Sequence, residues 1–576
     1  MMHRFLLAIA LVQAIPSQGQ TPADLSRFLA DTFQERLRDR PEYATGTGHH
    51  EYDDRWTDWS KAGRDLRRSH TQRALDQLNR FAEANLPAAD RVTVRVLQYD
   101  YRTELESEQP EIYIARISQL NGFHNSIYQT IDGMPAHTVH DYENIIARIR
   151  AMPAYVDQNI GIMDESIAKG MVQPRVVIDL IVAQLASQTA QDEKTSPLLA
   201  AFRNFPANIA PAEQTRLRGE ASEAYQHQFL PAWRRLHDYM AGKYALNARE
   251  RVGLGSIPGG KEAYALLVRR RTTTSYTPEQ IHKIGEDEVK RIESEMLAIA
   301  RETGFQGTLE EFDQKLHTTP DQHFHSKEEM LAYCRNIAKI IEPQLPKQFK
   351  QIPPLLYGVR PIPEDREAAS ATSAQAPSPD FSTPGWMNLN TYKPEEQFKY
   401  DKEALVLHEA VPGHIFQLTF ARGQRGLPDL RRFYGNNAYV EGWGLYAESL
   451  GAELGVYKDP YSRFGQLASE RFRAVRLVVD TGMHELGWTR DQAVAYFTQH
   501  SPGESLAEID RYISWPGQAL AYKMGQLKIL ELRREAERKL GSKFDIREYH
   551  DVVLRDGVLP LEVLGEQVES YINAAK

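Results

Sequence analysis

Apolar residues recur at helical spacing along most of the chain after residue 22. One face of the first such segment carries Leu25, Phe28, Leu29, Phe33 and Leu37, and residues 145–152 repeat the same i, i+3, i+4 pattern. Strand-like alternation is scarce, and no segment repeats at a convincing fixed period, which argues against a solenoid. The sequence therefore predicts a mainly α protein.

The balance of charged residues indicates which classes of molecule the protein is expected to bind. Lys and Arg number 69 and Asp and Glu 78, giving a net charge of −9, and no long basic stripe offsets this mild acidity. With 41% hydrophobic and 26% charged residues, the composition is that of a soluble globular protein. We expect no nucleic-acid partner.

Residues 1–20 have the pattern of a secretory signal peptide. Arg4 precedes the apolar run 5–12, and turn-forming residues such as Pro16 follow. The alternative is a buried first helix. Cys334 is the sole cysteine, so neither an internal disulfide nor a lipid anchor near the cleavage region is expected. No later segment has transmembrane length. We expect a secreted or periplasmic protein without membrane insertion after signal removal.

Two capping boxes predict where helices start. In the first, Thr277 is followed by Pro278 and by Gln280 at the third helical position, so a long helix should run to about Arg301. Residues 489–492 form the second box.

The segment 405–416 places His408, Glu409 and His414 in an apolar run, and a second apolar segment downstream carries Glu441 and Glu448. Ionisable groups rarely stand in such positions unless a metal or a partner compensates them. Two histidines with a glutamate directly after the first are typical of zinc hydrolases. The alternative, a helix end with buried and satisfied histidines, leaves Glu441 unexplained.

The two histidines are six residues apart instead of the usual four. In a regular helix, six residues at about 100° each leave a net rotation of roughly 240°, so the side chains would point to different sides. Pro412 lacks the amide that would bond to the carbonyl of His408, and Gly413 tolerates unusual backbone angles. We predict a broken or bulged turn that returns His414 to the metal.

These two motifs resemble those of the bacterial domain-of-unknown-function 885 family, His-Glu-Ala-x-Pro-Gly-His followed by Glu-Gly-Trp-x-x-Tyr-x-Glu. The resemblance extends over most of the chain after the signal peptide. The family is similar to gluzincin peptidases, in which a glutamate on a second helix is the third ligand. The resemblance implies one zinc ion per chain on His408, His414 and Glu441, with Glu409 as the general base. It also makes Glu448 a candidate for contact with a ligand or the substrate amine, although a structural ion pair is an equal alternative.

Three residues further along share a helical face at i, i+4 and i+8: Arg476, Asp480 and His484. Asp480 could orient His484, which would then hydrogen-bond the substrate carbonyl or the oxyanion. A surface salt-bridge ladder is the alternative. Tyr522, and after it Tyr512, are candidates for a second donor to the tetrahedral intermediate, although either could be a core residue.

Residues 366–380 are the least structured by composition, and residues 384–391 alternate. We expect a loop followed by a short strand beside the metal helix, whose Asn388 and Asn390 region could align an extended substrate by backbone pairing.

Together these features predict a large helical, zincin-like body with a cleft and at most a small sheet near the metal helix. Residues 21–350 would form one wall of the cleft and 351–576 the metal-binding catalytic region, or both would form one continuous domain. The protein is expected to be an exported zinc metallopeptidase that acts on a peptide or small amide. The sequence does not indicate an oligomeric state. The alternatives are a zinc amidase or esterase, and a non-catalytic helical binding protein, against which the intact Glu409 argues.

Overall fold

The computed structural model describes residues 20–107, 117–368, 370–378 and 381–575. The predicted signal peptide lies outside these residues except for Gln20. The mainly α prediction is confirmed, because helices dominate the described chain and strands form only a small sheet. No helix among the described residues is long and apolar enough to cross a membrane.

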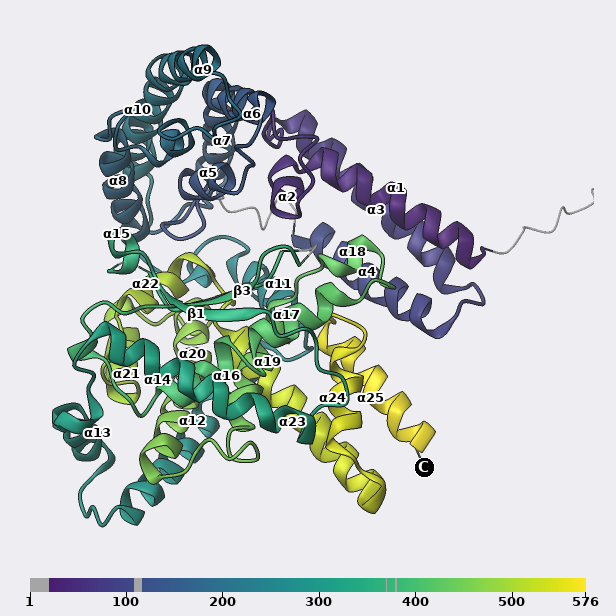
Figure 1. Cartoon of the computed structure of the whole chain (residues 1–576), viewed down its shortest axis with the longest axis vertical. Coiled ribbons are helices and arrows are strands. Elements are labelled where there is room, and N and C mark those ends of the chain that lie inside the picture. The colour runs from purple at the N-terminus through teal and green to yellow at the C-terminus, as the bar shows by residue number, and fades with distance from the viewer. Residues whose placement is uncertain (1–19, 108–116, 369, 379–380, 576) are drawn as a thin grey trace, which may run out of the picture.

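Helices α1 to α10 lie in the upper part of Figure 1, with α4 at mid-height, and most of the later helices form the larger body below. The first group is α1 Pro22–Asp39, α2 Pro41–Gly46, α3 Lys61–Ala82, α4 Ala88–Ser107, α5 Phe123–Asp132, α6 Val139–Arg150, α7 Met152–Ala168, α8 Arg175–Thr189, α9 Pro211–Ala224 and α10 Leu230–Tyr239. The second group begins with α11 Gly260–Thr272, α12 Pro278–Glu302, α13 Leu309–Thr318, α14 Lys327–Ile341, α15 Glu364–Glu367, α16 Lys402–Glu409, α17 His414–Gly423 and α18 Asp429–Arg432. It ends with α19 Asn437–Ser449, α20 Pro460–His484, α21 Arg490–His500, α22 Ala507–Ser514, α23 Leu520–Leu540, α24 Ile546–Leu554 and α25 Leu561–Ala575.

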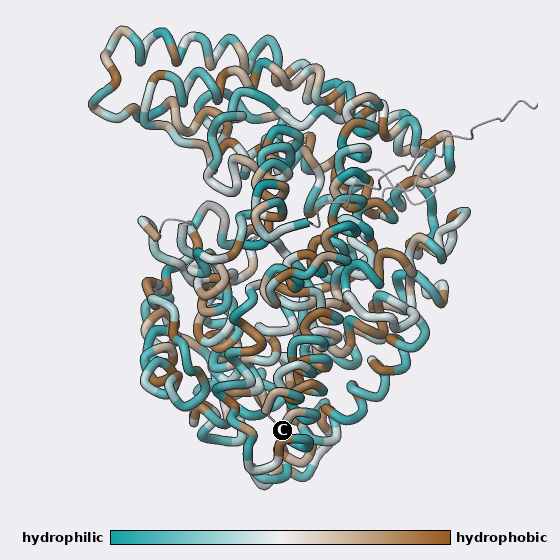
Figure 2. Tube along the Cα trace, turned by 90° about the vertical axis from the view of Figure 1, so that its right-hand side faces the viewer, coloured by the Kyte–Doolittle hydropathy of each residue, from teal (hydrophilic) through white to brown (hydrophobic). Residues whose placement is uncertain are grey.

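Short 3-10 and π segments extend or connect these helices. The 3-10 turns are η1 Pro197–Phe202, η4 Leu254–Ser256, η5 Pro320–Gln322, η6 Glu342–Lys347, η7 Pro394–Glu396 and η8 Gly541–Lys543. The π segments η2 Tyr225–Phe229 and η3 Met240–Tyr244 flank α10. Along the tube in Figure 2, hydrophobic and hydrophilic residues alternate in short stretches, as expected for amphipathic helices.

Both capping boxes mark helix starts as predicted. The hydroxyl of Thr277 accepts from the amide of Gln280, and α12 then runs from Pro278 to Glu302. Thr489 caps α21 in the same way. These local signals are sufficient because each satisfies backbone amides that a helix start leaves unpaired.

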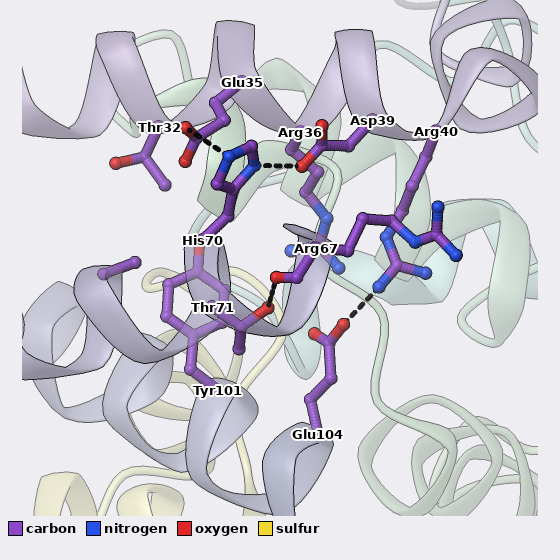
Figure 3. Close-up of a pocket in the computed structure, with 11 residues that line it drawn as sticks. Thr32, Glu35, Arg36, Asp39, Arg40, Arg67, His70, Thr71, Tyr101 and Glu104 are labelled. Atoms are coloured by element: carbon purple, nitrogen blue, oxygen red, sulfur yellow. Dashed lines mark hydrogen bonds and ion pairs between the residues drawn. The ribbon is translucent and has the colours of Figure 1, made fainter. Parts of the chain in front are cut away.

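A charged cluster ties α1 to α3 and α4 (Figure 3). The imidazole of His70 on α3 lies 2.6 Å from Asp39 and 3.4 Å from Glu35, both on α1. Arg40, which follows α1, pairs with Glu104 on α4. The cavity among these residues has a volume of about 30 Å³, room for only a water molecule or two. The cluster therefore joins helices and is too small to bind a substrate.

Among the described residues, three strands form one small sheet with the order β1-β3-β2. β1 (Tyr357–Pro361) is parallel to β3 (Gly385–Leu389), and β2 (Ser373–Gln375) is antiparallel to it. Helix α17 packs against both β2 and β3, which sets the sheet beside the segment that carries His414. The predicted small sheet near the metal helix is therefore present.

The hydrophobic core crosses the predicted boundary at residue 350. One buried apolar cluster includes both Trp56 and Ala519, and another includes both Val92 and Ile572. Helix α20 runs through the centre, buried over most of its length, and packs along α12. Residue 350 therefore does not divide the core.

Candidate metal centre

The segment between the two histidines breaks the helix as the sequence predicted. Helix α16 ends at Glu409, Ala410 and Gly413 have non-helical backbone angles, and α17 begins at His414. A Cβ atom at Gly413 would lie 1.9 Å from the carbonyl oxygen of His408, so only glycine fits this close approach. The interruption turns His414 back towards His408, and their ring centroids are 4.7 Å apart.

Helix α19 carries the second motif and packs against this break. The indole nitrogen of Trp443 donates to the carbonyl oxygen of Pro412 at 2.8 Å. On the next residue, a Cβ at Gly444 would lie 2.8 Å from Cε1 of His408 and 3.0 Å from Cε1 of His414. The tryptophan thus fixes α19 to the break, and the glycine leaves room for both imidazoles.

Three potential ligand groups converge at this place. Nε2 of His414 lies 3.3 Å from Oε2 of Glu441, and Nε2 of His408 lies 3.9 Å from the same oxygen. One donor atom from each residue falls within 4.8 Å of the other two, and no other such His, Cys, Asp or Glu group occurs in the described part of the chain. Two imidazole nitrogens and one carboxylate oxygen are donors that zinc prefers.

Glu448 orients one of these donors. Its Oε1 atom lies 2.7 Å from Nδ1 of His408, and the side chains of both residues are buried. Burial raises the pKa of Glu448 to about 7; in its ionised form this carboxylate accepts the hydrogen bond, so the Nδ1 atom of His408 carries the proton and its Nε2 atom presents a lone pair towards Glu441. This is the tautomer that a metal ligand needs, and the residues present therefore fit a zinc ion.

The surroundings set the charges of these groups. Burial lowers the pKa of His408, and the neighbouring His414 lowers it further, so its imidazole is neutral. Burial tends to raise the pKa of Glu441, but hydrogen bonding and charge from His414 outweigh it and hold the pKa at about 2. Burial also lowers the pKa of His414, whereas its contact with Glu441 raises it by more. An ionised carboxylate therefore faces the two imidazoles.

Glu409 stands next to the three potential ligands without being one. Burial raises its pKa to about 7, while the charge of His414 and the nearby backbone amide of Ala374 oppose the rise. A carboxyl group with a pKa near neutrality can both accept and return a proton under physiological conditions. Ala374 belongs to β2, so an edge strand of the sheet lies against this carboxylate.

We predicted that the strand around Asn388 and Asn390 aligns a substrate by backbone pairing, but its position in the sheet does not allow this. Asn388 lies on β3, which is the central strand and pairs on both sides, so its backbone cannot pair with a substrate. The Asn388 side chain accepts a hydrogen bond from Arg360 at 2.8 Å. The amide of Asn390 donates to the carbonyl oxygens of Glu367 and Ser370. Both asparagines stabilise the loop and the sheet, and β2 is the edge strand beside the candidate centre.

Tyr522 reaches the candidate centre from α23. Its hydroxyl helps to lower the pKa of Glu441, and it accepts a hydrogen bond from the guanidinium of Arg511 at 3.2 Å. The helices can approach so closely because Gly442 of α19 faces Gly525 of α23, where a Cβ at Gly442 would lie 2.4 Å from Cα of Gly525. Of the two predicted tyrosines, Tyr522 is the one placed beside a potential ligand.

His484 lies outside the candidate metal centre, and this position differs from the one that the predicted oxyanion role requires. Its Nδ1 atom accepts from the amide of Leu254 at 2.9 Å, so its Nε2 atom carries the proton and donates to the carbonyl oxygen of Tyr512 at 3.0 Å. The ring is fully buried, and burial lowers its pKa to about 3. Both nitrogens are occupied by backbone groups, which leaves none for a substrate.

Asp480 and Arg476 also differ from the predicted arrangement. Asp480 makes no hydrogen bond to His484, whose two ring nitrogens bond backbone groups. It accepts hydrogen bonds from the hydroxyl of Tyr264 at 2.5 Å and from the amide of Gly517 at 3.0 Å. Arg476 donates to the hydroxyl of Tyr512 at 3.0 Å and lies 4.6 Å from the ring centroid of Tyr522. The shared helical face predicted from the sequence is thus present, and it braces the segment 512–517.

Sequence reasoning missed three features of the site. They are the amide of Ala374, the guanidinium of Arg511 and the Gly442–Gly525 crossing. The glycines adjoin motif residues and were a usable signal, since a helical glycine often marks a close approach. Ala374 and Arg511 carry no pattern of their own.

The chain matches a family model described as bacterial protein of unknown function (DUF885) over residues 41–568. It belongs to the DUF885 family. The resemblance of its two motifs to that family is therefore confirmed. No curated protein matches the chain.

Two solved structures are similar over nearly the whole DUF885 chain. A presumed lipoprotein from Colwellia psychrerythraea has a TM-score of 0.90 at 28% identity and covers 96% of this chain and 100% of its own. A presumed lipoprotein of unknown function from Shewanella oneidensis has a TM-score of 0.75 at 18% identity and covers 94% and 99%. A presumed oligoendopeptidase F from Bacillus anthracis str. Ames has a TM-score of 0.30 at 12% identity and covers 88% of this chain and 96% of its own. These comparisons support the fold and leave the activity open.

Proposed function

We propose that this DUF885 protein is a zinc-dependent hydrolase that cleaves peptide bonds. The observation that carries the proposal is the convergence of His408, His414 and Glu441 beside a glutamate that is not itself needed as a ligand. A structural metal site has no use for such an extra carboxyl group, whereas a catalytic site needs a base next to the metal.

His408, His414 and Glu441 would hold the zinc ion. Bound zinc supplies Lewis acidity, which polarises the substrate carbonyl and makes water a nucleophile near neutral pH. Glu448 keeps the Nε2 atom of His408 deprotonated for this purpose.

Glu409 is the proton carrier in the proposed reaction. It accepts a proton from the attacking water as the water oxygen bonds to the carbonyl carbon, and it passes that proton to the amine nitrogen as the C–N bond breaks. Its pKa of about 7 suits both transfers. Tyr522, with Arg511 donating to its hydroxyl, would turn its own hydrogen towards the developing oxyanion.

The edge strand β2 offers a way to align an extended substrate. β2 pairs only with β3, so its other side is an unpaired edge among the described strands. A substrate strand added there would run beside Glu409, because the backbone amide of Ala374 on β2 lies near that carboxyl group. Backbone pairing of this kind favours peptides over small amides or esters.

A peptide-library digest tests the proposal. The purified, zinc-supplied protein should cleave peptides, and Glu409→Gln should lose at least about a hundredfold in kcat while keeping its zinc, since a general base contributes roughly 10²–10⁴-fold. Glu403→Gln is the matched control: Glu403 lies on the same helix, burial raises its pKa to about 7, and its partner is the hydroxyl of Tyr333. An intact library with cleaved small amides would instead favour an amidase.

We also propose that the protein is exported. The support is the signal-peptide pattern of residues 1–20, together with two structurally similar proteins described as lipoproteins. The sole cysteine, Cys334, is buried in α14. Fractionation of a native host should find the chain outside the cytoplasm and without a lipid; a full-length cytoplasmic chain would contradict this.

A further inference from the structure

A cavity of about 1160 Å³ lies between the N-terminal helices and the segments that surround the candidate metal centre. Its walls come from α3, α5 and α7 on one side and from α11 and residues 513–516 on the other. In Figure 1 these elements belong to the upper and lower parts of the molecule. Ligand pockets commonly measure about 300–1,000 Å³, so this one can hold a short peptide.

The lining of this cavity is basic, although the chain as a whole is acidic. Among the described residues, nine Lys and Arg line it against four Asp and Glu, in a chain with a net charge of −9. Three of the four carboxylates are already paired with lining cations, in the pairs Arg40–Glu104, Lys61–Asp65 and Arg64–Glu165. The cavity therefore attracts anions.

Arg271, at the end of α11, is a lining cation whose own charge is not balanced by a neighbouring carboxylate among the described residues. It is half buried, and its Nε atom has no hydrogen-bond partner among the described residues. Its contacts are with neutral groups: Oδ1 of Asn437 at 3.5 Å and the ring of Trp515 at 5.4 Å. Burial lowers its pKa to about 10, so the guanidinium still carries its charge at neutral pH. A partly buried cation without an acidic partner among the described residues is costly unless a ligand supplies one.

Two routes connect Arg271 with the candidate metal centre. Asn437 is the first residue of α19, one helical turn before Glu441. Trp515 also lies 5.9 Å from the guanidinium of Arg511, which donates to Tyr522 beside Glu441. The end of the cavity that contains Arg271 is therefore the end next to the potential metal ligands.

We propose that the cavity holds one end of the substrate, and that Arg271 binds a carboxylate there. The planar guanidinium matches a carboxylate with two parallel hydrogen bonds, and Trp515 keeps it in place. The carboxylate belongs either to the peptide C-terminus or to an acidic side chain. This inference rests on the proposed function and specifies its substrates as anionic peptides.

Equilibrium binding to the full-length, zinc-loaded Glu409→Gln protein tests it without turnover. The probes are short peptides of one sequence, made as the free acid or the C-terminal amide, each with Glu or Gln in the middle. We expect one of the two carboxylates to tighten binding by about tenfold or more, with the effect weakening at high salt. The acid–amide pair reports the C-terminus, and the Glu–Gln pair reports the side chain. Equal affinities in both comparisons would overturn the proposal.

Variants locate the effect. Arg271→Gln should abolish the preference, and Arg271→Lys should retain part of it. Arg269→Gln, on the same helix and paired with Glu106, is the matched control and should leave the preference unchanged. A preference that survives in a folded Arg271→Gln protein contradicts the assignment. Carboxylate-dependent binding without cleavage by the Glu409 parent would reject the proposed function alone, and cleavage indifferent to the carboxylate would reject this inference alone.

Discussion

The Nδ1 atom of His408 lies 2.7 Å from a carboxylate oxygen of Glu448, seven residues after Glu441 on the same helix. One helix therefore supplies a potential metal ligand and the group that orients another. The two sequence motifs form one unit, because the first depends on the second for both space and protonation state.

Removing Glu448 should weaken zinc binding. Glu448→Gln can still accept the His408 proton and should cost about tenfold in affinity, whereas Glu448→Ala should cost up to about a hundredfold. Competition with a chromogenic chelator measures this. Glu453→Gln, which disturbs a contact with Arg533 away from the centre, serves as the control. Unchanged affinity in both Glu448 variants would show that the contact is only structural.

Gly444→Ala should disrupt the site while leaving its helix intact. The added Cβ would fall within about 3 Å of both imidazoles, so at least one must move. We expect loss of stoichiometric zinc with unchanged helical circular dichroism. Gly161→Ala, inside α7 where nothing lies within 4 Å of the new atom, should instead keep the zinc and stabilise the fold by up to about 1 kcal/mol. Full zinc occupancy in Gly444→Ala would contradict the geometry.

His484→Ala should lower stability without lowering zinc content. The substitution leaves the amide of Leu254 and the carbonyl of Tyr512 unpaired in the interior, at a cost of about 3 kcal/mol. Denaturant unfolding and metal analysis of the same samples separate the two effects. A variant of parental stability with a large loss in kcat would restore the oxyanion role.

Asp480 should make the protein less stable as the pH rises. Burial raises the pKa of Asp480 to about 7, opposed by hydrogen bonds from Tyr264 and Gly517, whereas the unfolded value is about 3.9. Between these values the folded state holds a proton that the unfolded state has lost, so the free energy of unfolding falls with rising pH. The melting temperature of Asp480→Asn should decline less than that of the parent from pH 5 to pH 8. If the melting temperatures of the variant and the parent changed in parallel with pH, the raised pKa of Asp480 would be contradicted.

Local chemistry accounts for what the sequence predicted. The capping boxes at Thr277 and Thr489 and the break at Pro412 and Gly413 follow from short-range rules. The pairing of Glu441 with the two histidines was instead implied by the family resemblance. The predictions for His484 and Asn388 failed for a different reason. Whether His484 faces a substrate or a backbone amide depends on Leu254, more than 200 residues earlier in the chain. Likewise, alternation identified the strand at Asn388, but only its pairing partners make it central.

Metal analysis of the purified protein tests the central claim most directly. After supply with zinc and exhaustive dialysis, the account predicts one zinc ion per chain in the parent and none in a folded His408→Ala variant. No stoichiometric zinc in the parent, or full occupancy without His408, would contradict it.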